Sequence, residues 1–358
     1  MSYKIKDYIK DYSSDSEIKS ELAKRLSEYF ESRYCYPVSN GTVAIEIALK
    51  ALDIPRGSCV IVPDISFIAT ATAVANCGLV PVFADVSKEH FGLTLNALKS
   101  KLNKNTRAVI VVHLGGFVNR EILEIKDFCK SNGLYLIEDC AQAFSSSVSG
   151  KKVGTIGDVG TYSLQASKLI NCGEGGFILT DDAAIQIKCE MISNWGYSPE
   201  YRKFDSNLPS SNFRLSAVQS YLVLKQLSMV DEIIKERLDR VAGLKEAFNS
   251  SGIATKIPMK EEKFFDCPFY LPVESQNKIN TIEPRAEYPM RKSNIVKAIL
   301  NRFFPDLLEA YNEYNKDAGF EWSSDKLLCE VDLINISQKS NLSAMEIIKE
   351  YIDNQLQN

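Results

Sequence analysis

Hydrophobic residues near the start of the chain recur every three or four positions, as they do on one face of a helix. The repeat comprises Ile18, Leu22, Leu26 and then Tyr29 with Phe30. Ser14 and Glu17 stand three residues apart just before it, a spacing typical of a capping box. We therefore expect a helix that begins near Ser14 and buries one apolar face.

The next part of the chain alternates short apolar runs with helical patterns. The apolar runs predict strands at Ser58–Val62, Val80–Ala84, Ala108–His113 and Leu134–Glu138. The helical patterns are Ile65–Asn76, which is rich in small residues, and the amphipathic Glu121–Ser131. Strands that alternate with helices are typical of an α/β fold with an at least partly parallel sheet.

The last third of the chain has a weaker pattern. Ser216–Arg240 contains few helix breakers and predicts one helix long enough to link two lobes. Beyond it we expect a strand at Phe264–Val273 and a polar, turn-rich stretch at Ser275–Lys292. Helical patterns follow at Ser293–Tyr311 and Ala344–Gln357.

Composition narrows the class of protein. The 358 residues suffice for about two domains. Lys and Arg number 42 and Asp and Glu 46, a net charge of −4, which argues against a protein that coats nucleic acid. Hydrophobic residues make up 45% and charged residues 25%, as in soluble globular proteins. No apolar run has the length of a membrane span, so we expect no membrane partner.

Cysteine usage and the amino terminus indicate the compartment. Nine cysteines are present, and no two form a C-x-x-C pair, so zinc-ribbon and thioredoxin-like sites have no support and we predict no metal. Several lie in apolar runs, as reduced core thiols do. The first residues are polar and charged, unlike a signal peptide. We therefore predict a cytoplasmic protein.

A turn of small residues, Ser39-Asn40-Gly41-Thr42, leads into an apolar helical pattern. The N–H groups and the positive dipole end of such a helix suit a phosphate. Ser211–Ser216, which follows Asn194-Trp195-Gly196, opens the predicted long helix in the same way. Taken alone, each is more simply interpreted as a helix cap.

Two carboxylates, Glu138 and Asp139, end the fourth predicted strand, and Gln142 follows them. Ligands of open α/β sheets bind beyond the carboxyl ends of the strands. A carboxylate there suits a cationic ring nitrogen, and the amide suits a neighbouring oxygen. An exposed loop acid is the simpler alternative for this segment alone.

Lys168 stands between a β-type run, Gly160–Gln165, and the glycine-rich turn Cys172–Gly176. A desolvated lysine has a lowered pKa and can form a Schiff base. A surface lysine is the simpler alternative. The order of these features along the chain is more informative than any one of them. A phosphate turn, a strand-end acid, a lysine and a glycine-rich turn are the parts that pyridoxal 5'-phosphate needs.

In these features the chain resembles the DegT/StrS sugar aminotransferases, which are fold type I enzymes that depend on pyridoxal 5'-phosphate. The matching stretches are Ser39–Leu49, Pro63–Ala73, Pro81–Val86, Ile137–Ala143, Gly150–Asp158, Tyr162–Lys168, Gly173–Thr180 and Asn212–Gln219. The resemblance implies a large cofactor-binding α/β domain at 30–240 with a mostly parallel mixed sheet. It also implies a smaller C-terminal α+β domain at 241–358, with the helical segment 1–29 associated with it.

The resemblance assigns catalytic roles to two of these residues. It implies that Lys168 holds the cofactor aldehyde and moves protons, and that Asp139 pairs with the pyridinium nitrogen. Gln142 is implied to bond the ring's phenolic oxygen, and Phe67 to cover one ring face. Cys140 stands where relatives usually have alanine.

The resemblance also assigns the phosphate site. Gly41, Thr42 and Ser163 are implied to hold the phosphate of their own subunit. Asn212 is implied to reach the phosphate of the neighbouring subunit, which makes the expected assembly a homodimer with shared active sites.

The activity that the resemblance implies is the transfer of an amino group from an amino acid, expected to be glutamate, to a nucleotide-linked keto-sugar. Such amino sugars enter surface polysaccharides. Relatives often carry a histidine-containing loop in the C-terminal third, whereas the histidines here are His90 and His113. One alternative is therefore an enzyme with the same cofactor and another substrate. A second is a catalytically silent regulatory or scaffolding relative, against which the intact Lys168, Asp139 and Gln142 argue.

Overall fold

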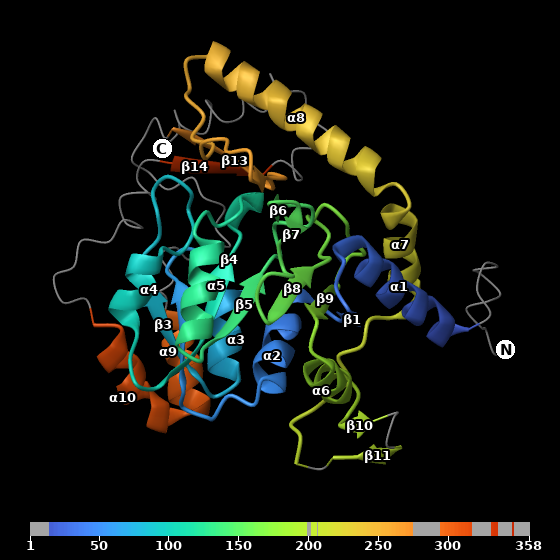
Figure 1. Cartoon of the computed structure of the whole chain (residues 1–358), viewed down its shortest axis with the longest axis vertical. Helices are drawn as coiled ribbons and strands as arrows, with labels where there is room; N and C mark the ends of the chain where they lie inside the picture. Colours follow the sequence, from blue (N-terminus) through green and yellow to red (C-terminus); the bar gives the residue numbers. More distant parts are fainter. Residues whose placement is uncertain are drawn as a thin grey trace.

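A seven-stranded sheet lies at the centre of the computed structural model, which describes residues 14–198, 202–205, 207–274, 294–316, 331–335 (backbone alone) and 346. In spatial order its strands are β1 (Tyr34–Val38), β9 (Gly176–Thr180), β8 (Val159–Ser163), β5 (Tyr135–Asp139), β4 (Thr106–Val112), β2 (Cys59–Pro63) and β3 (Val80–Ala84) (Figure 1). The strands from β8 to β3 are parallel, and β9 runs antiparallel to both of its neighbours. The prediction of a mostly parallel mixed sheet is confirmed.

Helices cover the sheet, and this explains its apolar strands. They are α2 (Gly41–Ala51), α3 (Ala69–Asn76), α4 (Leu95–Lys101), α5 (Ile122–Ser131) and α6 (Ala183–Ser193). Every residue of β2 and β3 is buried. Parallel strands buried on both faces have continuous apolar runs instead of alternating ones. Such runs are the signal that predicted these two strands.

The predicted α/β elements are present with small shifts at their ends. β3 has the predicted bounds, whereas β2, β4 and β5 are displaced by one or two residues. Helix α3 begins at Ala69 and not at Ile65. The N–H of Asp64 still bonds to the carbonyl of Ala84 in β3. The chain is therefore still paired with the sheet just before Ile65, and the helix begins only after it has turned away.

Helix α1 (Asp15–Phe30) begins as the sequence predicts, because the Ser14 hydroxyl accepts the N–H of Glu17 at 3.2 Å. It packs on β1 and α7 (Ala217–Leu227). The ring of Phe30 contacts Phe144, Tyr162 and Phe177 in the main core. The described part of α1 therefore contributes to the core of the large domain, and the association of residues 1–29 with the small domain stays a prediction.

The predicted helix Ser216–Arg240 is two helices, α7 and α8 (Val230–Ser250), which meet at Ser228 and Met229. No glycine or proline marks this break. It separates two packing partners: α7 contacts α1, whereas α8 contacts β13 (Tyr270–Glu274). α8 and the segment that follows it enclose a second apolar core of Val241, Leu244, Phe248, Ile253, Leu271 and Val273. This core supports a separate small lobe, and the boundary at residue 241 stays a prediction.

The predicted strand Phe264–Val273 is divided in the structure. β12 (Phe264–Phe265) pairs with β6 (Ser147–Val148), which also pairs with β7 (Lys151–Lys152), and β13 pairs with β14 (Val331–Asn335). Residues 266–269, which we call the strap, instead bond to the large domain. The N–H of Cys267 donates to Ser146 Oγ at 3.0 Å, and the N–H of Phe269 donates to the Gly115 carbonyl at 2.7 Å. Pro268 lacks an N–H, so the strap is a poor strand.

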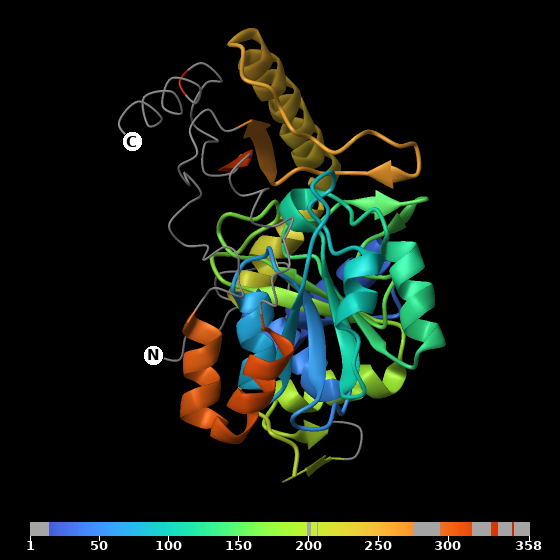
Figure 2. The ribbon, with the colours of Figure 1, turned by 90° about the vertical axis from the view of Figure 1, so that its left-hand side faces the viewer.

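The predicted helix Ser293–Tyr311 is also divided, into α9 (Asn294–Phe303) and α10 (Pro305–Tyr314), because Pro305 begins a new helix. Both helices lie beside α3 and β3 at the edge of the sheet, far from α8 (Figures 1 and 2). The two terminal nitrogens of the Arg56 guanidinium donate to the two carboxylate oxygens of Asp306 in α10 at 2.8 and 2.7 Å. Residues 294–316, which we expected in the C-terminal domain, therefore pack on the large domain.

The remaining predicted elements, Ser275–Lys292 and Ala344–Gln357, lie outside the described residues, apart from residue 346. Within the described residues there are also three short elements: β10 (Tyr197–Ser198), β11 (Lys203–Phe204) and the 3-10 turn η2 (Leu114–Gly116). Among the helices described, none combines the length and the apolar composition needed to cross a membrane.

Candidate active site

Lys168 lies in the connection between β8 and β9, beneath the strap. Its backbone N–H donates to the Gln165 carbonyl at 2.8 Å, which folds the connection into a tight turn. Its amine lies 4.4 Å from the centre of the Phe269 ring. Burial lowers the pKa of Lys168 to about 8, and attraction by Asp139 offsets this lowering only in part. A lysine with this pKa has a substantial neutral fraction near neutral pH, as an amine that attacks an aldehyde requires.

Asp139 ends β5 and is 6% exposed. Thr70 Oγ1 donates to its Oδ2 at 2.8 Å, and the N–H of Ala141 donates to its Oδ1 at 3.2 Å. Burial raises the pKa of Asp139, although these two hydrogen bonds and the charge of Lys168 oppose the rise. A cation placed against the carboxylate would counteract this rise in pKa. The site therefore suits a protonated ring nitrogen.

Gln142 is oriented by a single short hydrogen bond. Its Oε1 accepts the N–H of Gly115 at 2.6 Å. Because Oε1 already accepts this bond, Nε2 of the amide is available as a donor. A donor is what a phenolic oxygen of the cofactor requires.

The phosphate turn and the end of β8 meet in space. A Cβ at Gly41 would lie 2.9 Å from the Cβ of Ser163, so the first turn of α2 contacts Ser163 directly. Asn40 caps α2, and its Oδ1 accepts the N–H of Val43 at 2.9 Å. The N–H groups of Gly41 and Thr42 precede that bond and lie at the positive end of the helix dipole. The two predicted phosphate segments therefore form one site.

Phe67 precedes α3 and is 47% exposed. Its carbonyl accepts the N–H of Thr70 at 3.1 Å, and Thr70 in turn donates to Asp139. The backbone of Phe67 is thus connected to Thr70, the residue that supports the carboxylate. An aromatic side chain at this exposed place can cover the face of a flat ligand.

Asn212 is exposed and lies outside this group, in the segment before α7. Its Oδ1 accepts a hydrogen bond from Arg214 Nε at 3.0 Å, and its backbone bridges Asn194. The structure thus brings Lys168, Asp139, Gln142, Gly41, Thr42, Phe67 and Ser163 to one region and leaves Asn212 apart.

The sequence analysis did not identify some residues of the site. Thr70 and Ser66 form a hydroxyl pair at 2.8 Å, and their spacing of four residues in a predicted helix is a signal that would have identified them. Phe269 and Arg237 had no such signal. They line a small pocket beside the amine, together with Gln142, Ser163, Lys168 and Cys267.

A comparison with models of protein families identifies the family of this chain. The family model of the DegT/DnrJ/EryC1/StrS aminotransferases matches residues 10–316. The chain belongs to this family. The match includes every residue assigned above to the site.

Curated members of this aminotransferase family match parts of the chain. GDP-perosamine synthase from Vibrio cholerae is 38% identical over 213 residues, which are 60% of this chain and 58% of that protein. The L-glutamine:2-deoxy-scyllo-inosose aminotransferase of Streptomyces kanamyceticus is 34% identical over 218 residues, which are 58% of this chain and 51% of that protein. The chain therefore spans little more than half the length of these relatives.

Solved structures share the fold over almost the whole chain. The aminotransferase TlmJ from Streptoalloteichus hindustanus superposes with a TM-score of 0.76 at 21% identity, covering 95% of this chain and 90% of that one. For 3-amino-5-hydroxybenzoic acid synthase the TM-score is 0.74 at 19% identity, with 94% and 91% covered. These values confirm the predicted fold type I architecture.

The cofactor of this family is pyridoxal 5'-phosphate, and the residues of this chain fit it. In this family the cofactor site is expected to contain an amine, a buried acid, an amide donor and a group of residues that binds the phosphate. Lys168, Asp139 and Gln142 have the chemistry of the first three, and the close approach of Gly41 to Ser163 brings the candidate phosphate-binding residues together. The predicted cofactor is thus supported by the family and by the site.

Proposed function

We propose that the protein is an aminotransferase that moves an amino group from an amino acid to a keto-sugar. The observation that supports this most directly is that Lys168, whose pKa is lowered to about 8, lies close enough to the buried carboxylate of Asp139 to be attracted by it. The two residues supply a reactive amine and an acid for a ring nitrogen within one site. Membership in the aminotransferase family agrees with it.

Each residue of the site has a separate task in this reaction. When bound, the cofactor supplies an electron sink for the bond that breaks at the carbon bearing nitrogen. Nζ of Lys168 would take the proton from that carbon and deliver it to the carbon on the other side of the same nitrogen. Asp139 holds a proton at the ring nitrogen, and Gln142 donates from Nε2 to the phenolic oxygen. The turn at Gly41 and Thr42 binds the phosphate with Ser163.

The acceptor that we propose is a nucleotide-linked keto-sugar, and the donor is glutamate. GDP-perosamine synthases from three bacteria are similar to this chain, and the name of these enzymes includes a nucleotide. Other relatives are named for L-glutamine and inososes, which makes glutamine and a free cyclic polyol ketone the second pair to test. The product would be an amino sugar for surface polysaccharide.

We further propose a homodimer with shared active sites. Exposed apolar side chains gather on α7 and next to Asn212. Val218 is 56% exposed, Leu222 46% and Trp195 51%. A second copy that covers this face would bring Asn212 toward the neighbouring phosphate. Size measurement by light scattering tests the assembly, and Leu222→Glu is expected to dissociate it.

The cytoplasm is the compartment that we propose. All eight cysteines in the described residues are unpaired thiols, and seven of them are buried. Buried thiols of this kind persist in a reducing environment. Localisation of a tagged full-length chain in cells tests this assignment.

Absorbance and substrate panels test the proposed activity. The purified protein should bind pyridoxal 5'-phosphate and turn yellow, and borohydride should attach the cofactor to Lys168. The colour should bleach with glutamate and return with a nucleotide keto-sugar. Bleaching by glutamine alone would reassign the donor. A protein that stays colourless with added cofactor would instead support the silent relative.

A further inference from the structure

Glu138, the neighbour of Asp139 in β5, is a fully buried carboxylate with four hydrogen-bond donors. Its Oε1 accepts the backbone N–H groups of Ile156 and Gly157, both at 2.7 Å. Its Oε2 accepts the N–H of Gly154 at 2.9 Å and Nε2 of His113 at 3.0 Å. Each oxygen therefore takes two donors, which is its normal capacity.

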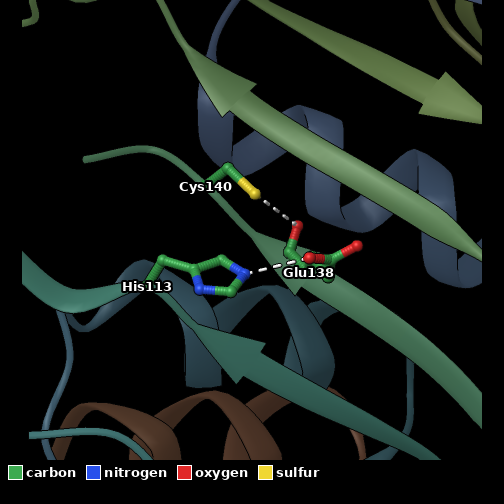
Figure 3. Close-up of side chains that lie close together, drawn as sticks. All are labelled: His113, Glu138 and Cys140. Atoms are coloured by element: carbon green, nitrogen blue, oxygen red, sulfur yellow. Dashed lines mark hydrogen bonds and ion pairs between the residues drawn. The ribbon is translucent and has the colours of Figure 1, made fainter. Parts of the chain in front are cut away.

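His113 is also fully buried, and its hydrogen bonds define where its proton lies. Nδ1 accepts the backbone N–H of Asn119 at 3.1 Å, so the ring proton is on Nε2. Nε2 points directly at the Glu138 carboxylate (Figure 3). The imidazole is thus a bridge that connects the end of β4 to the end of β5.

Cys140 completes a group that has the residue types of a metal site, with its donor atoms within 4.8 Å of one another (Figure 3). The hydrogen bonds argue against a metal. Both oxygens of Glu138 are already saturated, and Nε2 of His113 carries its proton toward them. Burial also raises the pKa of Cys140 well above its usual range, which disfavours the thiolate ligand. The group is therefore a hydrogen-bonded cluster without a metal.

The position of this group relative to Asp139 indicates that role. Successive side chains of a strand point to opposite faces, so Glu138 and Asp139 diverge from the same strand end. Glu138 binds the 154–157 loop, whereas Asp139 binds Thr70. The backbone of Asp139 itself is also bonded to His113: the N–H of His113 donates to the carbonyl of Asp139 at 3.1 Å.

We propose that Glu138 and His113 are positioning residues that hold Asp139 against the ring nitrogen of the cofactor. The buried hub of hydrogen bonds joins β4, β5 and the 154–157 loop behind the strand end. The side chain of Asp139 can then shift little when a ligand binds. This inference rests on the proposed function.

The charge of Glu138 is consistent with this role. Burial alone would raise the pKa of Glu138, but the bonds from His113, Gly154 and Gly157 outweigh it and lower the pKa. The carboxylate therefore stays ionised and fully bonded. It does not compete with Asp139 for the proton of the ring nitrogen.

Glu138→Gln in the full-length chain is the first test, and Glu124→Gln on the exposed surface of α5 is the matched control. The amide replaces one acceptor oxygen by an NH2 group that faces two donors. We expect the folded variant to bind pyridoxal 5'-phosphate about tenfold more weakly. We also expect the pH dependence of its visible absorption band to move in the same direction as in Asp139→Asn. A folded Glu138→Gln protein with wild-type affinity and an unchanged band would overturn the proposal.

A pair of substitutions at His113 decides the matter if Glu138→Gln does not fold. His113→Gln keeps an N–H near the position of Nε2 and should retain most of the wild-type affinity for pyridoxal 5'-phosphate. His113→Leu has no such donor and should lose this affinity. Equal affinities in the two variants would contradict the positioning role. ¹⁵N NMR of the wild-type protein provides an independent check, because the sequence has only two histidines. The proposal requires the His113 proton on Nε2, and a proton on Nδ1 would overturn it.

These results are separable from a failure of the proposed function. That function fails if the wild-type protein does not bind the cofactor or does not bleach with any amino donor. The positioning role fails if the wild-type protein does both and the variants behave like it.

Discussion

The hydroxyl of Thr70 donates a hydrogen bond of 2.8 Å to the carboxylate of Asp139, across 69 residues of sequence. Ser66 lies 2.8 Å from the same hydroxyl, so a short chain of hydrogen bonds reaches from α3 to the acid. Because Phe67 stands between Ser66 and Thr70 in the sequence, one short segment provides both the aromatic cover and the support of the acid.

Removal of this support should weaken the cofactor site. Thr70→Val keeps the shape of the side chain but leaves Asp139 with one donor fewer. We expect a loss of about 1–3 kcal/mol in cofactor binding, as for other hydrogen bonds to buried charged groups. Equilibrium titration with pyridoxal 5'-phosphate measures the loss. Thr70→Ser retains the hydroxyl and serves as the control, and equal affinities in the two variants would contradict this role.

Loss of the amine at Lys168 should abolish transamination while the fold remains. Lys168→Ala removes the group that moves the proton, and such groups contribute about 10²–10⁴-fold to the rate. Half-reaction kinetics with an amino donor measure the effect. Lys151→Ala, on the exposed strand β7, is the control and should behave like wild type. Appreciable turnover by Lys168→Ala would remove the central assignment.

Cofactor loading should depend on pH through Lys168. With a pKa of about 8, roughly one amine in ten is neutral at pH 7, against about one in three thousand for an ordinary lysine. The neutral form is the one that reacts, so the loading rate of cofactor-free protein should rise as pH increases through 8 and level off above it. Stopped-flow absorbance at several pH values measures this profile.

Asp139→Asn should move that profile to lower pH. The charge of Asp139 raises the pKa of Lys168, so its removal lets burial lower this pKa further. The same variant should bind some cofactor and lose most of its activity, because the ring nitrogen is no longer kept protonated. An unchanged profile would show that the two groups do not interact.

Gly41→Ala should damage the phosphate site selectively. The new Cβ would lie 2.9 Å from the Cβ of Ser163, so the first turn of α2 has to shift. We expect weaker binding of pyridoxal 5'-phosphate and little change in binding of pyridoxal, which lacks the phosphate. Gly243→Ala is the control, because nothing lies within 4 Å of its added Cβ. Equal losses for both ligands would place the damage elsewhere.

Asn315 should stabilise the edge of the sheet without affecting the site. Its Oδ1 accepts the N–H of Phe83 and its Nδ2 donates to the carbonyl of Pro81, both at 2.9 Å, so the amide pairs with the exposed edge of β3. Asn315→Ala is expected to lower the free energy of unfolding by about 1–3 kcal/mol. Chemical denaturation measures the loss, and the exposed Asn312→Ala is the control. Unchanged stability would contradict this role.

Four strands of the large domain, β2 to β5, were predictable because their apolar residues form nearly continuous runs, as in strands that are covered on both faces. Val80–Ala84 and the runs before and after it have apolar side chains at every position that the sheet requires. The helices were predictable where a cap and a periodic face coincide, as at Ser14. The division of Ser216–Arg240 was not, because no residue there disfavours a helix, and only the change of partner from α1 to β13 separates α7 from α8.

By itself, the sequence determined the parts that lie on continuous segments: the strand-end acid, the lysine before a glycine-rich turn, and the turn that opens α2. Each depends on bonds between residues close together in the chain. Only the tertiary structure decided how distant groups meet: Thr70 with Asp139, Gly41 with Ser163, and Phe269 with Lys168. It also placed α1, α9 and α10 on the large domain. An apolar helix face predicts that this face will be buried. It does not predict the packing partner, because the partner depends on complementary shape and on contacts between residues far apart in the sequence.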